Sequence, residues 1–115
     1  FDNGVITGTR NEGMGYSYGL TDATSSTIAT YLVPYVTAGK INYRINRNNQ
    51  FRSGTIEFAY DTASDSLAWD DSYTEKGAVN VDLSLSTSSS VITFDYNAHG
   101  NGHDATISYS LTRFN

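Results

Sequence analysis

Two histidines, His99 and His103, are the side chains of this sequence best suited to metal binding or proton transfer. They stand four positions apart in the segment NAHGNGHD, where Asp104 follows the second histidine. Two imidazoles and a carboxylate could bind a metal such as zinc. A helix would bring both rings to one face, but Gly100 and Gly102 disfavour a helix here. We expect a polar connection between two paired strands, with the histidines as weak candidates for a metal site.

Carboxylates suggest two other kinds of site. Glu57 and Asp95 could act as the acid and base of a glycosidase if they faced each other across a cleft, but both fall at outward positions of predicted strands. The five carboxylates between positions 61 and 75 could bind calcium, yet their spacing lacks the pattern of a calcium loop. We expect a solvated, turn-rich connection at 61–75, no enzymatic activity and no cofactor.

Aromatic side chains are numerous, at 13% of the sequence. Aromatic rings beside polar side chains are typical of sugar-binding surfaces and of subunit interfaces. Tyr16 and Tyr18, in a stretch that resembles a loop, are candidate ligand-binding residues. Trp69, in the acidic segment, is a third candidate if its ring is exposed, whereas a buried Trp69 would only anchor the segment. Tyr43, Tyr60, Tyr96 and Tyr109 fall on apolar faces and are expected in the core or an interface.

The stretch from Lys40 to Tyr60 carries the strongest structural signal, that of a β-hairpin. Apolar residues alternate with polar ones in both halves, as expected for strands with one buried face. The inward positions are Ile41, Tyr43 and Ile45 in the first half, and Ile56, Phe58 and Tyr60 in the second. Asn48 and Asn49 suit the turn between the halves because asparagine tolerates left-handed backbone angles.

The remaining strands are expected at 27–36, where Pro34 would end the strand, and at 78–87, 91–96 and 105–114. Val79, Val81, Leu83 and Leu85 mark the buried face of the second of these. The sequence thus predicts an all-β domain, an antiparallel β-sandwich or jelly-roll-like fold of five to seven strands with little or no helix.

A chain of 115 residues fits a single domain. We expect an irregular entry segment at 1–30, with one short strand near 5–7, and a sandwich body at 31–115. Because the sequence begins at Phe1, we expect it to be the end of a longer chain.

Charge and composition argue against several partners. The net charge of −5 disfavours nucleic acid, whose binding depends on clustered lysine and arginine. The longest apolar run, 31–36, is too short to cross a bilayer, so we expect no membrane insertion. The sequence has no cysteine, which excludes disulfides and thiolate metal sites within it.

Six short segments resemble the carboxy-terminal domains of tailed-phage tail fibres and related virion appendages. They are GKINYRINR (39–47), FRSGTIEF (51–58), DDSYTE (70–75), VNVDLS (79–84), ITFDY (92–96) and DATISYSL (104–111). The resemblance covers about 32–114, while 1–30 matches nothing in that family and NAHGNGHD departs from its usual Ser/Thr/Asn/Gly turn. It implies an extracellular virion module, commonly a homotrimer, that acts in attachment or as a structural cap.

Two functional hypotheses follow. In the first, the domain assembles with copies of itself or with other virion proteins. Its interface residues would be Arg44, Arg47 and Arg52, pairing with Asp70 and Asp71 of a neighbouring chain.

In the second hypothesis, the domain is a carbohydrate-binding β-sandwich module in which Trp69, or Tyr16 with Tyr18, stacks on sugar rings. The two hypotheses are compatible, because a fibre domain could bind a host-surface glycan.

Overall fold

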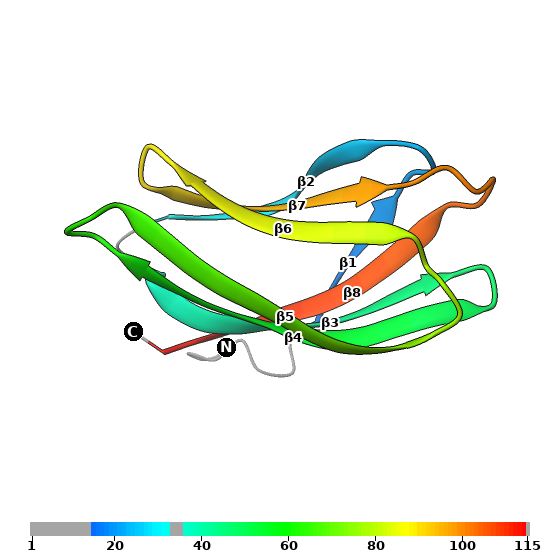
Figure 1. The fold of residues 1–115 in the computed structure, drawn as a ribbon, viewed down its shortest axis with the longest axis horizontal. Coiled ribbons are helices and arrows are strands. Elements are labelled where there is room, and N and C mark those ends of the chain that lie inside the picture. Colours follow the sequence, from blue (N-terminus) through cyan, green and yellow to red (C-terminus); the bar gives the residue numbers. More distant parts are fainter. Residues whose placement is uncertain (1–14, 33–35, 115) are drawn as a thin grey trace.

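The computed structural model describes residues 15–32 and 36–114, which form eight β-strands in two antiparallel sheets (Figure 1). The strands are β1 (Tyr16–Leu20), β2 (Ser25–Leu32), β3 (Ala38–Arg47), β4 (Gln50–Asp61), β5 (Ser66–Lys76), β6 (Val81–Ser88), β7 (Val91–Ala98) and β8 (Ala105–Arg113). These ranges contain no helix. The predicted fold class, an all-β sandwich, is confirmed.

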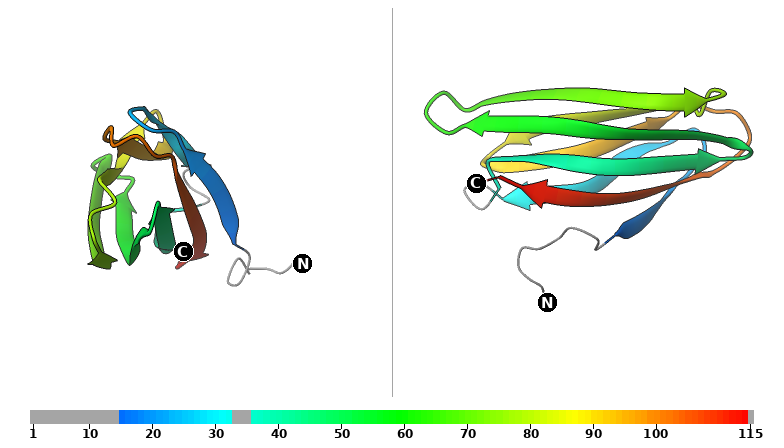
Figure 2. Two further views of the ribbon diagram at one scale, coloured as in Figure 1. Left: turned by 90° about the vertical axis from the view of Figure 1, so that its right-hand side faces the viewer. Right: turned by 90° about the horizontal axis from the view of Figure 1, so that it is seen from below.

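The two sheets differ in size, and this difference shapes the surface. The large sheet has the order β1-β8-β3-β4-β5, and the small sheet has the order β2-β7-β6. β5 and β1 lie at opposite edges of the large sheet (Figure 2). The first strand pairs with the eighth and the second with the seventh, which is the nested pairing of a jelly roll.

The predicted hairpin is present as β3 and β4. Arg47 pairs with Gln50, so Asn48 and Asn49 form a two-residue loop, and Asn48 has a φ of 55°. Asparagine adopts this left-handed conformation more readily than most residues. The pairing continues without a register shift to Ala38 and Ala59. The two strands and the turn predicted for the central hairpin are therefore confirmed.

The core lies between the inner faces of the two sheets. The positions predicted to face inward on β3 and β6 are buried, as is Val79 just before β6. On β7, Ile92, Phe94 and Tyr96 are buried. On β4, Ile56 and Phe58 are buried and Tyr60 packs against the core at partial exposure. The core also includes Leu20, Ile28, Val36, Ala98, Ala105, Ile107 and Leu111.

Three predicted loops or turns are wrong, and two of them hold the additional strands β1 and β5, which raise the strand number above the expected five to seven. The entry segment holds β1, and β2 begins at Ser25 rather than at 27. The acidic segment becomes β5 after a short turn at 62–65. The connection at 99–104 crosses from β7 in the small sheet to β8 in the large one, so it does not close a hairpin. The strand expected near 5–7 and the role given to Pro34 lie outside the described residues.

Candidate functional site

The three aromatic residues predicted to bind ligand do not share one site. Trp69 lies on β5, whereas Tyr16 and Tyr18 lie on β1 at the opposite edge of the large sheet. All three rings are exposed, by 39%, 51% and 36% respectively. The Tyr16 ring lies 5.6 Å from that of Tyr109, and the Tyr18 ring 6.2 Å from that of Tyr96. The β1 tyrosines are thus part of an aromatic cluster, and Trp69 belongs to a separate surface.

That surface is a row of side chains along the inner face of β5. Its members lie opposite inward-facing positions of β4: Trp69 pairs with Phe58, and Tyr73 with Gly54. We call Trp69, Asp71, Tyr73 and Glu75 the β5 row. Because β5 is the edge of the larger sheet, the three-stranded sheet covers this row incompletely, and half of Tyr73 is exposed. Alternation along a strand places the two aromatic residues about 13 Å apart, with Asp71 between them.

A tyrosine from the core reaches the carboxylate of the row. The Tyr43 hydroxyl donates to Asp71 at 2.8 Å to Oδ1 and 3.1 Å to Oδ2. Gly54 lies on β4, between the strands β3 and β5 that hold Tyr43 and Asp71. A Cβ at Gly54 would come within 2.8 Å of the Tyr43 hydroxyl oxygen. Glycine is therefore needed for Tyr43 to cross β4. Burial raises the pKa of the Asp71 carboxyl, against the opposing effects of the Tyr43 hydrogen bond and of the Arg52 charge.

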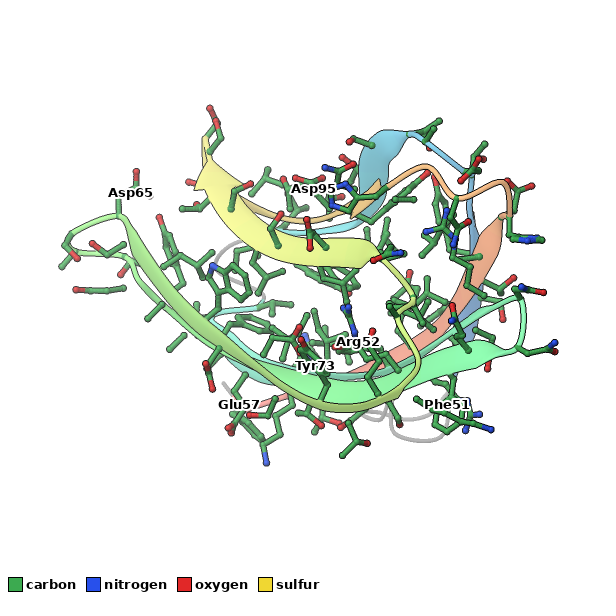
Figure 3. The ribbon with its side chains drawn as sticks, turned by 45° about the vertical axis from the view of Figure 1, so that its right-hand side comes forward. Phe51, Arg52, Glu57, Asp65, Tyr73 and Asp95 are labelled. Carbon is green, nitrogen blue, oxygen red and sulfur yellow. The ribbon has the colours of Figure 1, made fainter. Side chains whose placement is uncertain are left out.

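Arg52 holds the other end of the row. Its Nε and Nη2 donate to Glu75 Oε2 at 3.3 and 3.2 Å, and its Nη1 donates to the Val81 carbonyl at 2.8 Å. The guanidinium carbon lies 4.4 Å from the centre of the Tyr73 ring. Figure 3 shows Arg52 and Tyr73 together between β4, β5 and β6. This arginine fixes the orientation of Tyr73 and ties the edge of the large sheet to the start of β6.

The predicted interface role of Arg52 and Arg47 is not supported, because both are buried. Arg52 is 8% exposed and Arg47 only 1%. Both occupy inward positions of the hairpin, as alternation from Ile45 and from Ile56 indicates. Their guanidinium groups bond within the chain, so neither residue presents an exposed guanidinium to a neighbouring chain.

Arg47 makes five hydrogen bonds to segments that are distant in the sequence. Nε donates to the His103 carbonyl at 2.9 Å. Nη1 donates to the carbonyls of Val79 at 2.8 Å and Asn80 at 3.2 Å. Nη2 donates to the His99 carbonyl at 2.7 Å and to Asp22 Oδ1 at 2.6 Å. One side chain thereby joins the connections β1–β2, β5–β6 and β7–β8.

The other predicted interface residues are accessible but lie on different faces. Arg44 is on the outer face of β3, where its guanidinium stacks 4.3 Å from the Phe51 ring centre. Asp70 lies on the outer face of β5, opposite Glu57, whereas Asp71 belongs to the inner row. The same outer face thus holds Arg44 and Asp70, and their role in an interface stays a prediction.

The histidines act mainly through their backbone carbonyls, which accept from Arg47. The His99 ring contacts Asp82, with Nε2 and Oδ2 2.7 Å apart. Within 15–32 and 36–114, no group of three or more His, Cys, Asp or Glu side chains is placed to hold a metal ion. The structural role of these carbonyls left no local signal in the sequence.

Glu57 and Asp95 do not form a carboxylate pair. Glu57 lies on the outer face of the large sheet and Asp95 on the outer face of the small sheet, so they point away from each other (Figure 3). The core separates them. A glycosidase mechanism that uses these two residues together is therefore excluded by their placement.

No protein-family model matches the chain, and no curated protein matches it either. The resemblance to tail-fibre domains therefore stays a prediction.

The described residues include no helix long and apolar enough to cross a membrane.

Proposed function

We propose that the chain is a non-enzymatic attachment module that binds carbohydrate through the β5 row. One observation carries this proposal: two exposed aromatic rings flank a carboxylate on one face of an edge strand. The apolar faces of sugar rings stack on aromatic side chains, while sugar hydroxyls donate to carboxylates. The spacing of Trp69 and Tyr73 suits an oligosaccharide that extends along β5 better than a single sugar.

The positions of the row are well fixed before any ligand arrives. Tyr73 is held by Arg52, and Asp71 by the Tyr43 hydroxyl. A preorganised surface loses less side-chain entropy on binding. The β1 edge lacks the same combination, because only Ser17, and no carboxylate, stands between Tyr16 and Tyr18.

A glycan array tests the proposal. The wild-type protein should bind at least one glycan family, and Trp69→Ala should abolish that binding while the fold is retained, as judged by circular dichroism. Tyr16→Ala removes an aromatic ring of similar exposure from the opposite edge and should leave binding intact. If Tyr16→Ala abolished binding and Trp69→Ala did not, the site would not be the β5 row.

The resemblance supports a virion setting, in which this module belongs to a homotrimeric fibre or appendage and contacts a host-surface glycan. Sedimentation equilibrium should then detect trimers. A protein that stayed monomeric at high concentration would contradict the assembly.

A further inference from the structure

The charges around the β5 row influence which glycans can bind there. This inference rests on the proposed function. The row itself contains two carboxylates, Asp71 and Glu75. They are not equivalent. Glu75 Oε2 lies 3.2 Å from Arg52 Nη2, so its charge is compensated within the chain. Asp71 is instead bonded by the neutral hydroxyl of Tyr43.

Asp71 is also the carboxylate best placed to act on a ligand. It lies between Trp69 and Tyr73 on the same face, so a sugar chain that stacks on both rings must pass over it. The carboxyl group is partly buried, and a charge acts more strongly where water is displaced. The Arg52 charge also acts on Asp71, but this one arginine faces two carboxylates, so Asp71, Glu75 and Arg52 together carry a net charge of −1. Asp70 and Glu57 lie on the opposite face of the same strands, and the whole chain carries −5.

We propose that the β5 row selects glycans that carry free amino groups or no charge, and that it rejects glycans bearing carboxylate or sulfate groups. An ammonium group of an amino sugar would donate hydrogen bonds to the free lone pairs of Asp71, and a neutral hydroxyl would do so more weakly. An acidic sugar would place a second negative charge beside Asp71 in a partly dehydrated site.

Three oligosaccharides of equal length test this selectivity: β-linked N-acetylglucosamine oligomers, their fully deacetylated forms, and hyaluronan oligomers. Affinity should fall in the order deacetylated, acetylated, acidic. The first and last should differ by at least about tenfold at low ionic strength, and this ratio should shrink as salt is added.

Asp71→Asn and Asp70→Asn form a matched pair, because each removes one negative charge from the same strand. Asp71→Asn should reduce the ratio several-fold, while Asp70→Asn, on the outer face, should leave it nearly unchanged. Equal effects of both variants would attribute any preference to net charge and overturn the role of Asp71.

The failures of the two proposals can be told apart. Hyaluronan binding as tight as that of the deacetylated oligomer, lost in Trp69→Ala, would leave the β5 row as a glycan site and overturn its selectivity. Failure of all three oligomers to bind would overturn the selectivity as stated, whereas the glycan array decides separately whether the domain binds carbohydrate at all.

Discussion

Replacing Arg47 with methionine should strongly destabilise the domain. Methionine keeps an unbranched side chain but removes all five hydrogen bonds of an arginine that is 1% exposed. The Val79 carbonyl, whose bond to Arg47 is buried, would lose this partner at a cost of about 1–3 kcal/mol. Asp22 is partly exposed and can bond water instead, but each lost hydrogen bond costs about 1 kcal/mol net, which makes ~3–5 kcal/mol for the whole set.

A loss of this size is a large share of the whole stability. A domain of 115 residues has a free energy of unfolding of roughly 6–17 kcal/mol. A loss of ~3–5 kcal/mol should therefore lower the Tm by about 10–25 °C. Urea unfolding, followed by Trp69 fluorescence and by far-ultraviolet circular dichroism, measures the loss directly.

Arg44→Met is the matched control, because Arg44 lies on the same strand but on the outer face. It should change stability by less than about 1 kcal/mol, as is usual for surface substitutions. Arg47→Lys should recover only part of the loss, since an ammonium group has three donors and lacks the planar fork. If Arg47→Met cost no more than Arg44→Met, the three connections would not depend on this arginine.

Further predictions concern backbone space and pH. Gly54→Ala should lower the free energy of unfolding by about 1–3 kcal/mol, because a Cβ there would lie within 2.8 Å of Ser72 O, Tyr73 Cβ and the Tyr43 hydroxyl oxygen. Gly19→Ala is the control, because a Cβ at Gly19 would meet open space. Equal denaturation midpoints for the two variants would contradict the crowding at Gly54. Asp22 has a lowered pKa, chiefly because the Asn101 N–H donates to it, so its stabilising effect is present above pH ~4 and is lost as the pH falls further. As the pH is lowered below ~4, the free energy of unfolding should therefore fall less in Asp22→Asn than in the wild type. Asp71 has a raised pKa, so its ionisation lowers the stability of the fold as the pH rises from ~4 towards neutrality. The stability of Asp71→Asn should therefore increase relative to that of the wild type over that range. A relative decrease would show that the pKa of Asp71 is not raised.

The central hairpin could be predicted because each of its strands has one face that packs against the core. Ile41, Tyr43 and Ile45 meet the core, and every outward neighbour is polar. β5 could not be recognised in the same way. Its inner face is only partly covered, so Asp71 and Glu75 stand where a covered strand would hold apolar residues, and the alternation disappears.

The buried arginines show a different limit of sequence reasoning. The pattern places Arg47 and Arg52 on the inner face, but charge alone favours the surface. What allows their burial is a set of carbonyls from connections far along the chain, together with Asp22 and Glu75. Likewise, glycines in NAHGNGHD indicate a turn but do not indicate which sheet the next strand joins.

The nested pairing of β1 with β8 has a consequence for how the protein folds. β8 lies between β1 and β3, so an interior position of the large sheet is filled by the last of the eight described strands. The three-stranded unit β3–β4–β5 and the hairpin β6–β7 can form from neighbouring segments. The edge of β3 that pairs with β8 stays open until β8 is in place. Contacts between distant segments slow folding, and an open strand edge invites pairing with other chains. The domain is therefore most exposed to wrong pairing with other chains during its synthesis, before residues 105–113 have left the ribosome and paired with β3.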